Sequence, residues 1–250
     1  MESSILLAAE GLSRYYGEYC AVENLNIQLQ KGEVLGLLGP NGAGKSTTMQ
    51  MLTGNLAPTT GSIQINGLDL LEEPRRAKRH IGYLPEQPPV YRDLMVNEYL
   101  DYCAKLHGLR GTARTQAINL ACERCSLNEV KNRLIANLSK GYKQRVGIAQ
   151  AILHNPAVVI LDEPTVGLDP LQIREIRKLI RELGQEHSVI LSTHILPEVQ
   201  AVCDRVQILN RGRTVFNDSL AGGESLEKIF FELVYQEDPA LADTAPERLT

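Results

Sequence analysis

Three observations predict an α/β fold with a parallel sheet at its core. Between residues 157 and 209, short apolar runs alternate with segments of helical periodicity, which is typical of βαβ units. A glycine-rich segment at 39–44 lies between an apolar run and a helical pattern, where a sharp strand-to-helix turn needs glycine. The first third of the chain holds strand-like runs separated by turns such as Lys31-Gly32 and Asn66-Gly67, so a β-rich beginning is expected.

The first half of the chain predicts strands and one helix, followed by a helical segment. Strands are expected at 5–8, 26–29, 34–38, 63–65 and 81–84, and a helix at 46–52 that stops before Gly54. The stretch 95–137 has helical periodicity without good strand candidates. This pattern indicates a helical subdomain of about 90–155 inserted into a larger domain, although its periodicity alone requires nothing beyond packing.

The second half completes the βαβ pattern. Strands are expected at 157–161, 189–192 and 206–209, and helices at 171–183 and 195–203. A last helix is expected where four apolar residues recur at helical spacing, namely Leu226, Ile229, Phe230 and Leu233. The chain is therefore expected to form a single domain over 1–235, with a polar C-terminal tail at 236–250.

Composition and charge exclude several classes of protein. The 250 residues are 43% hydrophobic and 22% charged with a net charge of −4, which is ordinary for a soluble protein and gives no support to a nucleic-acid partner. No apolar run approaches the roughly 18–20 residues that span a bilayer, and residues 1–10 lack a basic region before an apolar core. We therefore expect a protein that is neither secreted nor membrane-spanning.

Five scattered cysteines suit a reducing compartment rather than a disulfide scaffold. Cys122 and Cys125 form a single CxxC, but there is no second pair and no nearby histidine. They are interpreted as ordinary helix cysteines, with redox or metal chemistry as the alternative.

The clearest motif lies between the strand at 34–38 and the helix at 46–52. Its glycines let successive backbone N–H groups face a polyphosphate, and the following helix points its positive dipole end at the same anion. Lys45 is expected to reach the β- and γ-phosphates, and Ser46 to offer a hydroxyl oxygen to Mg²⁺. A plain glycine-rich turn would not need Lys followed by Ser here. The motif fits GxxxxGK[ST] and consists of Gly39, Pro40, Asn41, Gly42, Ala43, Gly44, Lys45, Ser46 and Thr47.

A second motif ends the apolar run at 157–161 with two acidic residues, Asp162 and Glu163. A buried parallel strand would deliver both carboxylates at its C-terminal edge. Asp162 is expected to hold Mg²⁺, and Glu163 to polarise the attacking water in phosphoryl transfer. By itself an apolar run before Asp-Glu is weak evidence, and it gains weight from the glycine-rich motif.

A third motif identifies a family. Residues 138–145, Leu-Ser-Lys-Gly-Tyr-Lys-Gln-Arg, resemble the LSGGQ signature of ABC ATPases, and they lie shortly before the Asp-Glu strand. Taken alone, this segment could be an ordinary helix with Ser139 as its N-cap. Ser139 and the N–H of Gly141 would open a helix whose N-terminus binds a γ-phosphate held by a second subunit.

The resemblance extends from about residue 11 to about residue 231 and implies the fold and further site residues. The ABC-ATPase fold is a P-loop NTPase fold whose mixed sheet core carries an antiparallel β subdomain and an inserted helical subdomain. By this resemblance Tyr16 stacks on adenine, Asp169 is the D-loop acid at the dimer interface, and His194 is the switch histidine. Their plain alternatives are an ordinary tyrosine, an N-cap before Pro170 and a capping histidine. His194 follows the strand at 189–192, so it is expected at the sheet edge of Glu163 and near the γ-phosphate.

Two departures from the family pattern indicate which subfamily the chain resembles. Glu86 occupies the usual glutamine position of the Q-loop and Gln87 follows it; a carboxylate still suits Mg²⁺ but cannot donate a hydrogen bond. Lys140 and Tyr142 replace a glycine and a glutamine of the signature. These departures resemble ATPases of ABC-2 type exporters, including gliding-motility, drug-export and nitrous-oxide-reductase-maturation systems.

The resemblance implies an ATP hydrolase that uses ATP and Mg²⁺ with Glu163, His194 and Lys45 as catalytic residues. Its expected partners are a second ATP-binding subunit, with a homodimer favoured, and an integral membrane permease. Its expected location is peripheral, at the cytoplasmic face of the inner membrane. Two other classes of protein share some of these motifs. A non-transport ABC ATPase acting on ribosomes or DNA would favour tandem cassettes or long coiled coils, and a P-loop phosphotransferase would lack the signature helix.

Overall fold

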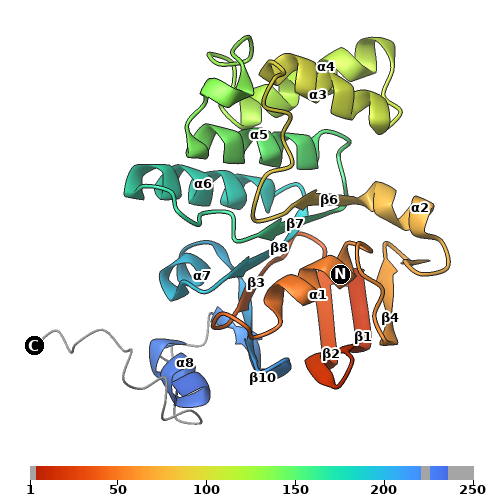
Figure 1. Ribbon diagram of the computed structural model, residues 1–250, viewed down its shortest axis with the longest axis vertical. Helices are drawn as coiled ribbons and strands as arrows, with labels where there is room; N and C mark the ends of the chain where they lie inside the picture. Colours follow the sequence, from red (N-terminus) through yellow and green to blue (C-terminus); the bar gives the residue numbers. More distant parts are fainter. Residues whose placement is uncertain (1–3, 221–225, 236–250) are drawn as a thin grey trace, which may run out of the picture.

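The computed structural model describes residues 4–220 and 226–235, and these residues form two β-sheets with helices around them (Figure 1). The predicted tail at 236–250 lies outside the described residues. In the view of Figure 1, helices α3, α4 and α5 form the top of the molecule, and the strands β1, β2 and β4 lie at the lower right.

The smaller sheet is antiparallel and has the strand order β2-β1-β4-β5. Its core side is formed by alternate residues, such as Ile27, Leu29, Ile63 and Ile65, which are almost fully buried. This alternation is the pattern of a half-buried sheet. The strands are β1 (Ile5–Tyr16), β2 (Tyr19–Gln30), β4 (Thr60–Ile65) and β5 (Leu68–Asp69).

The larger sheet has the strand order β10-β9-β3-β8-β7-β6 and is mixed, because β10 pairs antiparallel with β9 while the other pairs are parallel. Every residue of β3, β7 and β8 is buried, as expected of parallel strands covered on both faces. The strands are β3 (Val34–Leu38), β6 (Ile81–Leu84), β7 (Val158–Asp162), β8 (Ser188–Thr193), β9 (Arg205–Asn210) and β10 (Arg213–Ser219).

One group of helices packs near the larger sheet, and a second group forms the inserted helical lobe. Apolar residues of the lobe, such as Leu100, Cys125 and Ile148, belong to the same buried cluster as Leu161 of the sheet, so the lobe shares its core. The helices near the larger sheet are α1 (Lys45–Leu52), α6 (Pro170–Leu183), α7 (Leu196–Val202) and α8 (Leu226–Tyr235); those of the lobe are α3 (Val96–Leu106), α4 (Gly111–Arg124) and α5 (Lys140–Ile152). Short turns of helix are α2 (Pro74–Ala77), η1 (Lys78–His80) and η2 (Ile135–Asn137).

The predicted α/β class and most elements are confirmed, and three details differ. The first two strands are longer than predicted, because β1 continues past Gly11 through a bulge in which that glycine has a φ of +60°. β10 was not predicted because it is an edge strand whose residues are exposed or half-buried without alternation. β5 and α2 were missed because they are two and four residues long.

Cys122 and Cys125 fit their interpretation as ordinary helix cysteines, since they lie in the last turn and at the C-cap of α4. All five cysteines are free, and Cys122 and Cys125 are buried in the helical lobe. Burial raises the pKa of both thiols, which disfavours the reactive thiolate. Within residues 4–220 and 226–235, no group of three or more His, Cys, Asp or Glu side chains is placed to hold a metal ion. Over the same residues, no helix is long and apolar enough to cross a membrane.

The end of α5 is followed by a half-buried histidine that makes stability depend on pH. His154 lies 3.0 Å from the carbonyl oxygen of Ile81 and stacks on His107 with ring centroids 3.8 Å apart. Burial and, to a smaller extent, the neighbouring His107 lower the pKa of His154 to about 4. Because the unfolded chain then binds the proton more tightly, this stability is fully present above about pH 6.5 and is lost as pH falls toward 4.

We predict that lowering the pH from about 7.5 to about 5.5 costs roughly 1 kcal/mol of unfolding free energy through His154. The change His154→Gln keeps a donor for the carbonyl of Ile81 and removes the titration, so its stability should fall less over this interval. Denaturant unfolding at both pH values measures the difference, with His80→Gln as the control. An equal loss in His154→Gln and the parent would assign the pH dependence to other groups.

Candidate active site

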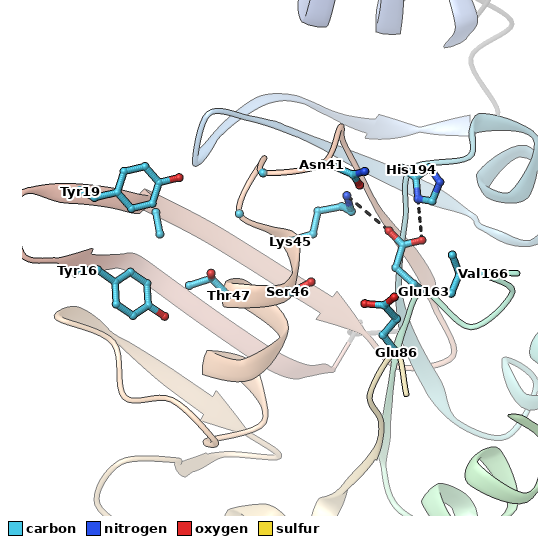
Figure 2. Close-up of a pocket in the computed structure, with 13 residues that line it drawn as sticks. Tyr16, Tyr19, Asn41, Lys45, Ser46, Thr47, Glu86, Glu163, Val166 and His194 are labelled. Atoms are coloured by element: carbon cyan, nitrogen blue, oxygen red, sulfur yellow. Dashed lines mark hydrogen bonds and ion pairs between the residues drawn. The ribbon is translucent and has the colours of Figure 1, made fainter. Parts of the chain in front are cut away.

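The glycine-rich segment 39–44 forms one wall of a cavity of about 350 Å³ (Figure 2). Two glycines are required here by geometry. Gly44 has a φ of +98°, and a Cβ on it would lie 2.7 Å from the carbonyl oxygen of Ala21. A Cβ on Gly39 would collide with the carbonyl oxygen of Leu209. The loop therefore fits between β2 and β9 only because these positions carry no side chain.

The N-terminus of α1 opens into this cavity. Asn41, Gly42 and Gly44 line it from the loop, and Lys45, Ser46 and Thr47 line it from the first turn of the helix. Pro40 and Ala43 do not line the cavity but stabilise the loop, since the N–H of Ala43 donates to the carbonyl of Pro40 over 3.2 Å. A loop that ends at a helix N-terminus is suited to binding an anion.

Lys45 is buried with only 6% of its side chain exposed. Its Nζ donates to the carbonyl oxygens of Gly39 at 2.8 Å and Pro40 at 3.1 Å, and lies 3.6 Å from Oε1 of Glu163. Burial lowers the pKa of Lys45, and the Glu163 carboxylate opposes that shift. The ammonium group is therefore held at the cavity by backbone carbonyls and one carboxylate.

Glu163 lies between Lys45 and His194, as the dashed lines of Figure 2 show. Nδ1 of His194 lies 3.0 Å from Oε2 of Glu163, so the predicted proximity at one sheet edge is present. Glu163 has a φ of +47°, a left-handed conformation that a non-glycine residue adopts at a cost. Its N–H donates to the carbonyl oxygen and the Oγ of Ser192, at 3.2 and 3.0 Å, which holds this conformation.

Carboxylates lie in or beside the cavity: Glu86 and Glu163 line it, whereas Asp162 is buried next to Glu163 and is not among the lining residues. They do not form a metal site by themselves, and Mg²⁺ commonly takes its other ligands from phosphate and water. Asp162 is buried, and its Oδ1 accepts a 2.5 Å hydrogen bond from Ser192. Burial raises the pKa of Asp162, the hydrogen bond from Ser192 lowers it, and the carboxylates of Glu163 and Glu86 raise it further. A cation would relieve this repulsion, and the hydroxyl of Ser46 opens into the same cavity. The residues present therefore fit Mg²⁺.

The structure distinguishes the two Q-loop candidates. Glu86 lines the cavity and lies below Glu163 in Figure 2. Gln87 is exposed and is not among the residues that line it. The suggestion that Gln87 takes over after a loop shift therefore requires a conformation different from this one.

Two tyrosines form the far end of the cavity. Tyr16 and Tyr19 pair across the turn between β1 and β2, and both rings line the cavity. Tyr16 is 47% exposed, and the guanidinium of Arg14 lies 4.8 Å from its ring centroid. Sequence reasoning missed Tyr19, and also Ala21 and Val166, which line the same cavity. For Tyr19 the only signal was its place next to a two-residue turn opposite Tyr16.

The remaining predicted residues lie elsewhere on the chain. Ser139, Gly141 and Asp169 line a separate cavity of about 680 Å³. Ser139 caps α5 by accepting from the N–H of Tyr142, and Asp169 caps α6 by accepting from the N–H of Gln172. Both N-cap interpretations are therefore correct. The two groups of predicted binding residues do not meet within one chain.

The signature segment packs on the loop that follows Glu163. A Cβ on Gly141 would lie 2.6 Å from the side-chain oxygen of Gln172, so glycine is needed for this contact. The side chain of Lys140 lies against Gly167, which has a φ of +67°. Lys140, which replaces a glycine of the signature, thus contacts a loop of the same chain.

Comparison with known proteins assigns this site to a family. The sequence model of the ABC transporter family matches residues 22–166, more than half of the chain. The chain belongs to the ABC transporter family. Domains of this family bind and hydrolyse ATP, so this chain is an ABC ATPase.

Relatives and solved structures agree with this assignment. The ABC transporter ATP-binding protein YxlF of Bacillus subtilis is 40% identical over 215 residues, which cover 86% of this chain and 71% of YxlF. The bacitracin transport ATP-binding protein BcrA of Bacillus licheniformis is 39% identical over 212 residues, covering 84% of this chain and 68% of BcrA. The structure of CbiO1 from Clostridium perfringens, part of the ABC transporter complex CbiONQ, has a TM-score of 0.80 and 28% identity, covering 97% of this chain and all of CbiO1.

Proposed function

We propose that this ABC ATPase is the ATP-hydrolysing subunit of an ABC-2 type exporter, and that two copies close head to tail around two MgATP. The observation that carries the proposal is the division of the binding residues between two cavities. The loop, Glu163 and His194 line one cavity, whereas Ser139 and Gly141 line another. Two chains placed head to tail would bring the N-terminus of α5 in one chain to the ATP of the other.

Within each site we assign the following roles. Lys45 binds the β- and γ-phosphates, Tyr16 stacks on adenine, and Ser46, Asp162 and Glu86 hold Mg²⁺. When bound, Mg²⁺ would neutralise charge on the phosphate oxygens. Glu163 accepts a proton from the attacking water, and His194 keeps the Glu163 carboxylate oriented through the 3.0 Å contact.

A membrane permease is the proposed partner, since BcrA is a transport protein and CbiO1 is part of a transporter complex. We propose that it docks on the helical subdomain, about 90–155, and on the segment 85–92. A cavity of about 380 Å³ lies between these parts and is lined by Pro85, Pro89 and His107. Glu86 of the ATP site directly follows Pro85 of this cavity in the chain, so docking and nucleotide state are expected to influence each other. We therefore propose that the chain lies at the cytoplasmic face of the inner membrane.

Purification of tagged Glu163→Gln protein from detergent-solubilised membranes with MgATP tests the proposal. We expect an abundant protein with several membrane spans to copurify in equal amount, as two ATPase and two permease chains. Mass identification and stoichiometry measure it, and the same purification without MgATP is the control. Ribosomal proteins or nucleic acid in place of a membrane protein would support a non-transport ABC ATPase instead.

A further inference from the structure

We propose that Glu198 is a positioning residue for ATP hydrolysis, because its buried carboxylate ties together the two loops that carry Glu163 and His194. This inference rests on the proposed roles of those two residues. Glu198 lies in α7 and is 2% exposed. An acidic residue is almost never buried to this degree unless it is paired, so its partners require an explanation.

Both oxygens of Glu198 accept hydrogen bonds from hydroxyl groups of two segments that are distant in the sequence. Oε1 accepts a short hydrogen bond from the hydroxyl of Thr165, and Oε2 accepts one of 2.6 Å from the hydroxyl of Thr193. Arg177 of α6 lies 3.9 Å from Oε1 and supplies the opposite charge. Thr165 and Thr193 are themselves buried, at 3% and 0% exposure. A desolvated carboxylate with two hydroxyl donors is a strong and directional link.

The two threonines that donate to Glu198 lie next to the proposed catalytic residues in the sequence. Thr165 follows Glu163 by two residues, and Thr193 is the last residue of β8, directly before His194. Strands β7 and β8 are parallel neighbours, with Asp162 paired to Ser192. Glu198 therefore joins the ends of two adjacent strands just beyond the 3.0 Å contact between Glu163 and His194.

Ser192 makes a second connection between the C-terminal ends of β7 and β8, on the other side of Glu163 and His194 from Glu198. Ser192 donates to Asp162 and accepts from the N–H of Glu163, which holds the strained backbone of Glu163 at a φ of +47°. Glu198 fixes the following residues, and Thr193 also accepts from the N–H of Ile195 at 3.1 Å. A displacement of about 1 Å between catalytic groups can cost on the order of 100-fold in rate, so such a link affects turnover directly.

The test compares hydroxyl removal with hydroxyl retention. Thr193→Val keeps the shape of the side chain and removes its donor, and we expect kcat to fall by about 10- to 100-fold while KM for MgATP changes by less than about twofold, since the phosphate loop is untouched. Thr193→Ser restores the donor and should recover kcat to within about threefold. Thr165→Val should behave like Thr193→Val, and Glu198→Ala should be at least as slow.

Ser188→Ala is the matched control. Ser188 is the first residue of the same strand and is 1% exposed, and its hydroxyl accepts from the N–H of Gly32 over 2.8 Å. It should lose comparable stability without a change in kcat. All rates are normalised to the number of MgATP-binding sites, and Tm is measured in parallel, so that unfolded protein is not counted as slow enzyme.

Three results would overturn the inference. They are a normalised kcat of Thr193→Val equal to that of Ser188→Ala, a failure of Thr193→Ser to recover, or a raised KM with unchanged kcat. If Glu198→Ala does not fold, the valine and serine variants still decide the question. Failure of the proposed roles themselves would look different, because Glu163→Gln would then hydrolyse ATP at the parent rate.

Discussion

Replacing Glu163 with glutamine is expected to lower kcat for ATP hydrolysis by about 10²- to 10⁴-fold while MgATP still binds. The amide keeps the shape of the side chain, but it cannot accept a proton from the attacking water. Lys45 and the phosphate loop remain in place, so the binding contacts survive. Phosphate release under saturating MgATP measures kcat, and equilibrium titration of a fluorescent nucleotide measures binding.

The same variant should accumulate as a dimer. If two chains close on two MgATP and hydrolysis reopens them, a slow variant remains closed, and its mass in size-exclusion chromatography with light scattering should double when MgATP is added. The matched control is Glu73→Gln, since Glu73 is an exposed carboxylate paired with Arg76. Full activity of Glu163→Gln would remove Glu163 from the mechanism. Loss of activity without a dimer would keep the role of Glu163 and contradict the head-to-tail arrangement.

Sequence reasoning succeeded where chemistry is local or lies at a common sheet edge. The loop 39–44 could be predicted because its glycines, Lys45 and Ser46 are contiguous and lie between a strand and a helix. The proximity of Glu163 and His194 could also be predicted, since parallel strands present their C-terminal ends at the same edge. In both cases secondary structure alone determines where the side chains meet.

It failed where contact depends on packing between distant segments. Glu198 lies 33 residues from Thr165, and nothing in its helical context distinguishes it from a solvent-exposed glutamate. Tyr19 was missed because the rings that line the cavity depend on the register of β1 with β2, and this register is altered by bulges. Neither the register nor the depth of burial follows from periodicity.

The charges of the site also emerge only in three dimensions. Asp162, Glu163 and Glu86 come from two segments about 76 residues apart and act on the same buried region, where the pKa of Asp162 is raised. Lys45 offsets part of this negative charge, and ATP brings more of it. The negative charge of these carboxylates is therefore only partly neutralised until a polyphosphate and its cation bind together. This imbalance explains why Lys45 should matter both for binding and for stability.

The change Lys45→Met is expected to weaken MgATP binding by at least about 100-fold, close to 3 kcal/mol, because it removes a desolvated cation from the phosphate site. Equilibrium titration measures the loss. Lys105→Met is the control, since Lys105 is an exposed lysine whose Nζ lies 2.6 Å from Asp101. Binding within about threefold of the parent would contradict the role of Lys45.

The same variant tests whether Lys45 also compensates Glu163 before nucleotide binds. Removing Lys45 takes away the ammonium group 3.6 Å from the buried Glu163 carboxylate, so the unfolding free energy should fall by more than the loss of packing explains. Adding Glu163→Gln removes the uncompensated charge, and the double variant should regain about 1 kcal/mol relative to Lys45→Met alone. Denaturant unfolding without nucleotide measures all four proteins of this cycle. Additive effects of the two changes would mean that the 3.6 Å contact contributes nothing to stability, and that Lys45 acts only on the phosphates.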